Sequence, residues 1–554
     1  MRIRVRNGSF SVHAIAGTYV VLLGIDADAA ALPGLLGFAI EREDRTENER
    51  YFLTGYKTFR ETGEGIPPGI PVSTRDFPVQ AFLWGDYTTK PSHDYVYHIH
   101  PVYGAPKRLD LRPPVTVAVH TGRPENDGHA VWFNRGVAAS QAYARKFRNA
   151  DPRTVPDRKA WIWLSRGLEE ALLGFIRDTQ AGDQIRGAFY EFRYVPVLQA
   201  FKLALDRGVD VKIVYDARTP ETATPNERAI EQAGLPGSAC IPRRRNPSFI
   251  AHNKFMVRVR NGQPDRVWTG STNLTEGGIF GQSNVGHLVR DAAVAATFLG
   301  YWEELRTDPE AAALRRWTDP RPPTPALDPL ELPASGTTAF FSPRRGLDQL
   351  DWYTELMDSA QRAVFLTAAF GVNDRFEERI GADKDYLRYL LLERASSGEI
   401  EVFRRDADTR FAIGGALTQG GLGRWTEEKL TDLNGHVKFI HTKYMLIDPL
   451  GPDPVVITGS ANFSNASTSN NDENMLVIRG DTGVADLYLG EFMRLFNHFS
   501  FRDYLQDYRD PIDAPPETER TPGRQRLFLT TDESWARPYF IPDTSRWKER
   551  TMFA

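Results

Sequence analysis

The sequence predicts an α/β protein of two similar halves, each a mixed sheet flanked by helices, preceded by an all-β, sandwich-like domain. Three observations support this prediction. Residues 1–120 contain short β-branched and aromatic runs separated by turns. From Trp161 onward, helical and strand-like segments alternate, which is typical of α/β folds. A proline-rich stretch near Pro322 and Pro323 then separates two segments with the same rhythm.

The chain has 554 residues, which is too long for one ordinary core, because domains usually have about 100–200 residues. Within the second half we expect a helix at 386–395 and a strand at 399–403. The predicted boundaries are 1–120 for the sandwich-like accessory domain, 121–158 for a connector, 159–318 for the first half, 319–335 for a proline-rich linker, 336–506 for the second half, and 507–554 for a tail that packs on the body.

Charge and cysteine content narrow the classes of protein. The net charge is −4, from 68 basic and 72 acidic residues, whereas a dedicated non-specific DNA binder is usually basic overall. A basic cleft on a neutral molecule stays compatible with this total. The single cysteine, Cys240, excludes an intrachain disulfide and fits a reducing compartment. With no apolar run behind the basic start, we expect a cytoplasmic protein without an integral membrane segment.

The same motif occurs once in each half. His252-Asn253-Lys254 precedes Gly270-Ser271-Thr272-Asn273, and His441-Thr442-Lys443 precedes Gly459-Ser460-Ala461-Asn462. The spacing from histidine to glycine is identical (270 − 252 and 459 − 441, both 18). Each unit is typical of a hairpin whose first strand presents His and Lys on one face and whose return strand delivers Gly-Ser-x-Asn to the same end.

These residue types suit phosphodiester chemistry. Lysine holds the phosphate charge, neutral imidazole attacks phosphorus, and protonated imidazole acts as an acid. One half provides a single histidine, so both halves must face one phosphate to provide a nucleophile and an acid. The sequence therefore predicts one site shared by the two halves of one chain, which we expect to act as a monomer.

The two motifs resemble the His-x-Lys-x4-Asp signature and the following Gly-Ser-x-Asn of the phospholipase D superfamily, over about residues 160–505. The second copy fits better, with His441, Lys443 and Asp448, whereas Val259 replaces the aspartate in the first copy. The resemblance implies two phospholipase D-like halves, a covalent phosphohistidine intermediate, and neither a metal nor another cofactor. It also implies catalytic roles for the following residues: His252 as the nucleophile, His441 as the acid, Lys254, Lys443, Asn273 and Asn462 as phosphate ligands, and Ser271 and Ser460 as their support.

Glu473 is a further candidate catalytic residue, because each histidine needs a partner that orients its second nitrogen. Glu473 follows His441 by 32 residues, and the equivalent stretch of the first half, Gln282-Ser283-Asn284, has no acid. Glu473 can reach across to His252, stay with His441, or only cap a loop; the sequence leaves all three open. Arg243-Arg244-Arg245 is either an anion-binding cluster or a solvated loop.

The substrate also stays open at this level. The first hypothesis is a phospholipase D-like hydrolase or transferase acting on a phospholipid. The second is a metal-independent nuclease acting on DNA or RNA, which the neutral overall charge disfavours. A non-catalytic scaffold is the third, and the intact His and Lys of both copies argue against it.

Overall fold

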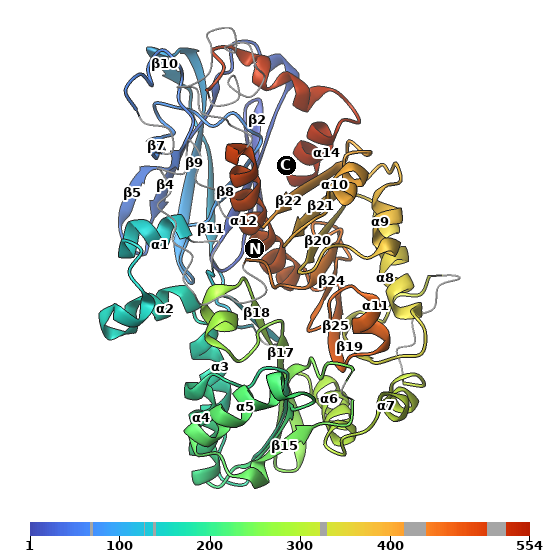
Figure 1. The fold of residues 1–554 in the computed structure, drawn as a ribbon. Helices are drawn as coiled ribbons and strands as arrows, with labels where there is room; N and C mark the ends of the chain where they lie inside the picture. The colour runs from blue at the N-terminus through green and yellow to red at the C-terminus, as the bar shows by residue number, and fades with distance from the viewer. Residues whose placement is uncertain are drawn as a thin grey trace.

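The computed structural model describes residues 1–66, 70–126, 128–136, 140–246, 248–321, 330–414, 439–506 and 528–554. Parts of the predicted linker (322–329) and tail (507–527) lie outside the described residues. Two α/β units and an all-β unit make up the body (Figure 1). The predicted fold class, α/β halves preceded by an all-β domain, is confirmed.

The N-terminal unit is a sandwich of two antiparallel sheets. One sheet has the order β1-β2-β3-β8, and the other has the order β10-β9-β4-β5 with β11 paired to β9. Trp535, Tyr539 and Phe540 from the C-terminal tail pack into the core between them. The strands are β1 (Arg2–Asn7), β2 (Phe10–Ala16), β3 (Val21–Ala27), β4 (Gly37–Asp44), β5 (Glu49–Phe52), β8 (Leu83–Asp86), β9 (Asp94–Ala105), β10 (Arg108–Leu111) and β11 (Val115–His120).

The first α/β half is a seven-stranded sheet of order β12-β18-β17-β16-β13-β14-β15. Its edge strand β12 falls within the segment 121–158, where the sequence suggested only a connector. The strands are β12 (His129–Phe133), β13 (Gln184–Phe189), β14 (Asp210–Asp216), β15 (Cys240–Arg243), β16 (Lys254–Arg260), β17 (Gln263–Gly270) and β18 (Val285–Val289). The accompanying helices are α3 (Leu168–Arg177), α4 (Val195–Asp206), α5 (Pro220–Ala233) and α6 (Ala292–Leu305).

The second half repeats this topology, with the order β19-β25-β24-β23-β20-β21-β22. In both halves the hairpin that carries the motif pairs antiparallel to the first of three parallel strands. The strands are β19 (Gly336–Ser342), β20 (Ala363–Ala368), β21 (Leu387–Leu392), β22 (Thr409–Ile413), β23 (Tyr444–Ile447), β24 (Val455–Gly459) and β25 (Glu473–Arg479). The helices include α8 (Asp348–Asp358), α9 (Asp374–Ile380), α10 (Ser397–Phe403) and α12 (Thr482–Gln506).

Two sequence predictions in the second half were wrong. The expected helix at 386–395 is the strand β21, and the expected strand at 399–403 belongs to helix α10. The run Leu387–Leu392 is buried on both faces in the middle of a parallel sheet, so it lacks the alternation that marks a half-buried strand. Helix α10 starts at a capping box between Ser396 and Glu399, a signal that outweighs the β-branched residues that follow.

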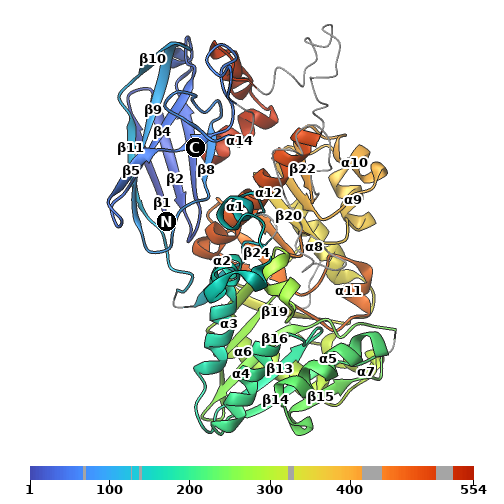
Figure 2. The ribbon, with the colours of Figure 1, turned by 60° about the vertical axis from the view of Figure 1, so that its left-hand side comes forward.

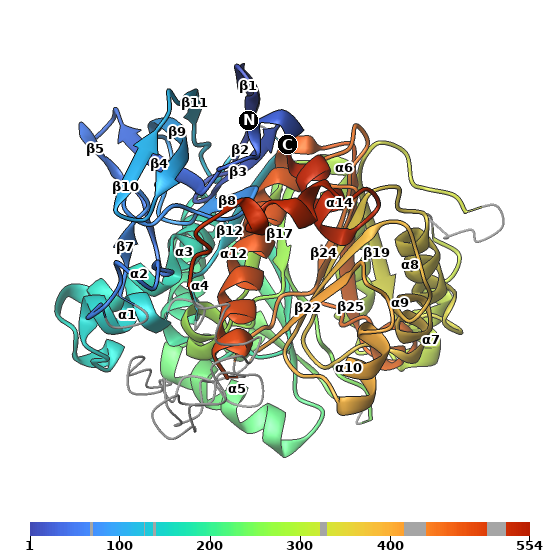
Figure 3. The same cartoon turned by 90° about the horizontal axis from the view of Figure 1, so that it is seen from above.

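The two halves share a core, to which α6, α12 and the facing sides of both sheets contribute. The C-terminal helix α14 (Ser545–Phe553) lies between the sandwich and the sheet of the second half (Figure 2 and Figure 3). Arg550 pairs with Asp26 of the sandwich, and Lys548 pairs with Asp408 beside β22. None of the helices in the described ranges has the length and hydrophobicity of a membrane span.

Candidate active site

The catalytic candidates lie where the two motif hairpins meet. His252 lies two residues before strand β16 and His441 three residues before β23, and the return strands β17 and β24 end at Gly270 and Gly459. At Gly270 φ is +134°, and an added Cβ would lie 2.2 Å from the carbonyl oxygen of Val285. Glycine is therefore required there for the close approach of the neighbouring strand β18.

Backbone hydrogen bonds join the halves on either side of the site. The N–H of His252 donates to the carbonyl of Asp472 in the second half (2.9 Å). The N–H of His441 donates to the carbonyl of Ser283 in the first half (3.1 Å). Each histidine is thus placed by the opposite half, which makes the shared site a property of the whole chain.

The side-chain partners of the histidines are exchanged in the same way. Nδ1 of His252 lies 2.8 Å from Oε2 of Glu473, and Nδ1 of His441 lies 2.8 Å from Oδ1 of Asn284. Of the three alternatives for Glu473, the geometry selects the one in which it reaches across to His252. Asn284 is its counterpart: it follows His252 at the spacing at which Glu473 follows His441 (284 − 252 and 473 − 441, both 32).

The motif serines hold these partners. Ser460 Oγ donates to Oε2 of Glu473 (2.7 Å), and Ser271 Oγ donates to Oδ1 of Asn284 (2.8 Å). The amide nitrogen of Asn284 donates to the carbonyl of Gly278 (2.8 Å), which fixes Oδ1 as the atom that faces His441. Both rings therefore carry a proton on Nδ1 when neutral, and Nε2 keeps its lone pair.

The lysines and asparagines of the motifs complete the site. Each lysine Nζ donates to the backbone carbonyl of the histidine two residues before it, at 2.6 Å for both Lys254 and Lys443. Asn273 Nδ2 donates to Oε2 of Glu191 (2.6 Å), a contact that the sequence did not reveal. No motif marks Glu191; its position just after strand β13, the neighbour of β16, is the only sequence signal.

Burial and a surplus of cationic groups set the electrostatics. Burial lowers the pKa of His252, an effect that the Glu473 carboxylate opposes. Burial and the nearby lysines lower the pKa of His441 well below its usual range. Burial lowers the pKa of Lys254 to about 8 and that of Lys443 well below its ordinary value. Glu473 stays ionised, because His252 and Lys254 outweigh its burial and lower its pKa. Such a site favours an anion.

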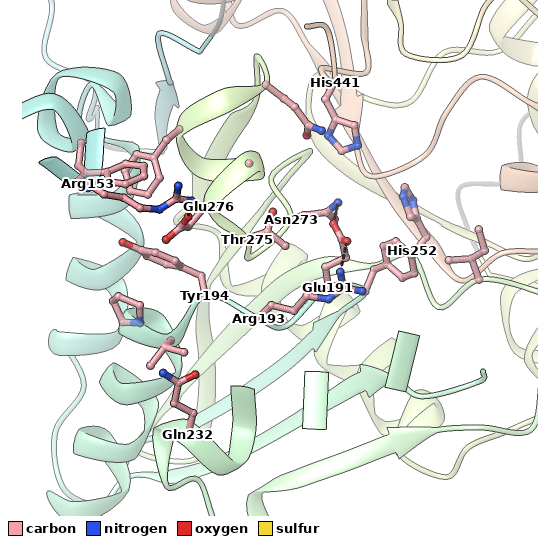
Figure 4. Close-up of a pocket in the computed structure, with 18 of the residues that line it drawn as sticks. Arg153, Glu191, Arg193, Tyr194, Gln232, His252, Asn273, Thr275, Glu276 and His441 are labelled. Atoms are coloured by element: carbon pink, nitrogen blue, oxygen red, sulfur yellow. Dashed lines mark hydrogen bonds and ion pairs between the residues drawn. The ribbon is translucent and has the colours of Figure 1, made fainter. Parts of the chain in front are cut away.

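A cavity of about 1230 Å³ opens onto these groups. Its lining includes His252, His441, Asn273 and Asn462, so both halves contribute to one cavity. In Figure 4, Asn273, Glu191 and Arg193 lie between the histidines and a second group made by Arg153, Glu276 and Tyr194. The lysines, the serines and Glu473 are buried behind this lining.

Two other sequence features have structural roles. Asp448 accepts from the backbone N–H groups of Gln361, Arg362 and Ala363, which ties the second hairpin to the start of β20. Arg243 is 2% exposed and pairs across the interface with Asp472 (2.7 Å) and within its half with Asp308 (2.8 Å). Arg243 is therefore a buried interface residue, whereas Arg244 and Arg245 are exposed in the loop that follows β15, as the solvated-loop alternative expected. The described residues include no group of three or more side chains suited to a metal ion.

The family comparison agrees with this geometry. Residues 176–306 and 412–496 match the model of the PLD-like domain of cardiolipin synthase. Each matched region contains one copy of the motif, so both halves of the chain are similar to this phospholipase D-like domain. Members of the phospholipase D superfamily are phosphodiesterases or transferases, and the paired motifs support an enzyme of that kind.

Comparison with solved structures gives distant likenesses. A polyphosphate kinase from Porphyromonas gingivalis is 12% identical (TM-score 0.37), over 57% of this chain and 46% of the kinase, so less than half of the kinase is matched. A phosphatidylserine synthase from Haemophilus influenzae is 11% identical (TM-score 0.41), over 70% of this chain and 93% of the synthase. Nuc from Salmonella typhimurium, a phospholipase D family member, is 27% identical (TM-score 0.21), over 24% of this chain and 84% of Nuc. No curated protein matches the sequence.

Proposed function

We propose that the chain hydrolyses or transfers phosphodiesters through a covalent phosphohistidine at His252. The observation that supports this best is the unequal pairing of the two imidazoles. His252 has a carboxylate partner, Glu473, which makes its Nε2 the more basic and more nucleophilic nitrogen. His441 has an amide partner, Asn284, and its lower proton affinity suits an acid that gives up its proton readily.

In the first step, Nε2 of His252 attacks phosphorus, a P–N bond forms, and the P–O bond to the leaving alcohol breaks. His441 gives its Nε2 proton to the leaving oxygen. The bound phosphate supplies the negative charge that raises the pKa of the buried His441 and keeps that proton in place. Lys254 and Lys443 hold the non-bridging oxygens, together with the N–H groups of Asn273 and Asn462.

In the second step, neutral His441 removes a proton from water or from an acceptor alcohol. The oxygen attacks phosphorus, the P–N bond breaks, and His252 is regenerated. The Glu473 carboxylate stabilises the positive charge that His252 carries while the P–N bond forms and breaks.

We propose a phospholipid as the substrate, with a metal-independent nuclease as the alternative. The arginines of the cavity lining are each paired with a carboxylate: Arg153 with Glu276 (2.8 Å), Arg158 with Glu169 (2.7 Å) and Arg193 with Glu191 (3.1 Å). A polyanion needs further unneutralised cations along its backbone. The charge of the described cavity therefore suits one phosphate. A monomer is proposed because both motifs lie in one chain, and a cytoplasmic location because of the single buried Cys240.

A burst experiment tests the mechanism. With bis-p-nitrophenyl phosphate in EDTA, His441→Asn is expected to release about one equivalent of p-nitrophenol and then stop, because this leaving group needs no proton but water needs a base. The protein should then carry an acid-labile phosphoryl group on His252. His252→Asn is the matched control and should give no burst. A burst from His252→Asn alone would show that His441 is the nucleophile and His252 the acid. No burst from either variant would refute the phosphohistidine route.

A parallel assay tests the substrate. Phosphatidylcholine vesicles and single-stranded DNA are incubated with the wild-type chain in EDTA. Cleavage of the lipid alone supports the proposal, and cleavage of the DNA alone selects the nuclease. Turnover that requires a divalent metal would contradict the whole mechanism, and no turnover of any diester would support the scaffold.

A further inference from the structure

Two equivalent positions of the duplicated fold differ sharply in chemistry. Glu191 is the second residue after strand β13, and Phe370 is the second residue after the equivalent strand β20. Both line the cavity. Phe370 is 47% exposed and the side chain of Glu191 is 22% exposed. At this position the first-half wall of the cavity thus carries a carboxylate, and the second-half wall carries an aromatic ring.

A carboxylate is unexpected beside a phosphate site, because it repels the substrate's charge. Glu191 nevertheless lies next to Asn273 and the histidine pair (Figure 4). Asn273 is 6% exposed, and its Oδ1 has no hydrogen-bond partner in the described part of the chain. Glu191 pairs with Arg193 (3.1 Å) and accepts from Asn273 (2.6 Å), and its carboxylate oxygens keep further lone pairs for a donor, as does the buried Asn273 Oδ1. Acceptors of this kind suit a ligand that donates hydrogen bonds.

The rest of the first-half wall is polar and internally neutralised. Arg153 pairs with Glu276, and Arg158 donates to both Glu169 oxygens and to the hydroxyl of Tyr194 (3.1 Å). These pairs leave little net charge for a second phosphate. They do offer a polar surface to a small uncharged or zwitterionic group.

We propose that Glu191 and Asn273 Oδ1 recognise a hydroxyl or ammonium group on the smaller alcohol of the diester, while a larger apolar arm leaves over Phe370. This proposal rests on the proposed phosphodiesterase function and makes Glu191 a specificity-determining residue. The substrate class is an amphipathic diester with one donor-bearing alcohol.

The test uses three p-nitrophenyl diesters that differ only in the second alcohol: ethyl, 2-hydroxyethyl and 2-aminoethyl. Products of cleavage at either ester bond are counted by chromatography, with the spontaneous rate subtracted. Wild type should prefer one or both donor-bearing esters over the ethyl ester by about tenfold or more in kcat/KM, since hydrogen bonds to charged groups are strong. The two donor-bearing esters distinguish a hydroxyl ligand from an ammonium ligand.

Glu191→Gln should reduce this preference to within about threefold, with a larger loss on the preferred ester than on the ethyl ester. Glu303→Gln, a change at a half-exposed glutamate on α6, is the matched control and should behave as wild type. An equal loss on all three esters would show that Glu191 only orients Asn273 and would overturn the proposal, as would a wild type without preference.

Binding separates this proposal from the chemistry. Calorimetry on His252→Asn with the same three esters should show the same preference, and adding Glu191→Gln should remove it. A preference in binding without turnover by the wild type would refute the proposed catalysis and support ligand recognition by Glu191 and Asn273 Oδ1. Equal binding of the three esters would refute this recognition, whether or not the wild type turns them over.

Discussion

Replacing Glu473 by Gln changes the charge beside His252 with almost no change in shape. The carboxylate is fully buried, and its Oε2 lies 2.8 Å from Nδ1 of His252 and 2.7 Å from Oγ of Ser460. Glutamine gives His252 the kind of neutral partner that His441 already has in Asn284. The variant therefore makes the two halves alike in this respect.

The expected loss follows from the strength of that contact. A hydrogen bond to a charged group contributes about 1.5–3 kcal/mol, against about 0.5–1.5 kcal/mol for a neutral one. The difference of about 1–2 kcal/mol corresponds to a loss of about 5- to 30-fold in kcat, because the charge on His252 grows as the P–N bond forms. If the amide instead turns its NH₂ toward Nδ1, the ring is held in the wrong tautomer and the loss approaches about 10⁴-fold.

The pH dependence of kcat/KM in Glu473→Gln gives an independent test, because the direction of its shift is predicted. Burial lowers the pKa of His252 and Glu473 raises it, so removing the carboxylate lowers that pKa further. Attack requires neutral His252, so the acid limb of kcat/KM should move to lower pH in the variant. The measurement is the pH profile of bis-p-nitrophenyl phosphate cleavage in EDTA, with thermal unfolding recorded in parallel.

The matched control is Asn284→Asp, which places a carboxylate beside His441 and should raise the pKa of that ring. An unchanged plateau and an unmoved acid limb in Glu473→Gln would refute the assignment of Glu473 to His252. A rate gain in Asn284→Asp, with little loss in Glu473→Gln, would point to His441 as the nucleophile, because the added carboxylate would then lie beside the attacking ring.

Three further predictions concern a cation, a glycine and the terminal helix. As pH rises through about 8, Lys254 loses its proton, and kcat/KM should fall. Lys254→Met should be inactive, yet its free energy of unfolding below that pH should be about 1–3 kcal/mol higher than that of the wild type, because no charge is buried. A less stable variant would contradict this prediction. Gly270→Ala should lower the free energy of unfolding by about 2 kcal/mol or more. The control is Gly300→Ala in helix α6, whose Cβ would lie 3.5 Å from Trp317 and which should raise the free energy of unfolding by about 0.5–1 kcal/mol. Equal effects of the two variants in denaturant titrations would refute the close-approach argument. Phe553→Ala, at a side chain that is 0% exposed in α14, should cost about 3–5 kcal/mol and give the sandwich a separate calorimetric transition, and one unshifted transition would refute the bridging role of the helix.

Local patterns predicted much of the fold and failed where tertiary burial overrode them. The two motif hairpins lie where the spacing of their residues predicted them. Leu387–Leu392 was misread as a helix, because a run buried on both faces has no period that separates a strand from a buried helix. Strand β12 was missed, because His129–Phe133 becomes an edge strand only by pairing with β18, far away in the sequence.

For the site, the residues alone showed the two His-x-Lys and Gly-Ser-x-Asn motifs and their equal spacing, and the chemistry then required both halves. These are properties of local hairpins, which depend on neighbours in the chain. Which half orients which histidine depends on how the two sheets meet, because Glu473 and Asn284 reach across the interface. Within the first half, the pairing of β16 with both β13 and β17 brings Glu191 against Asn273, a contact between strand ends far apart in sequence that no motif encodes.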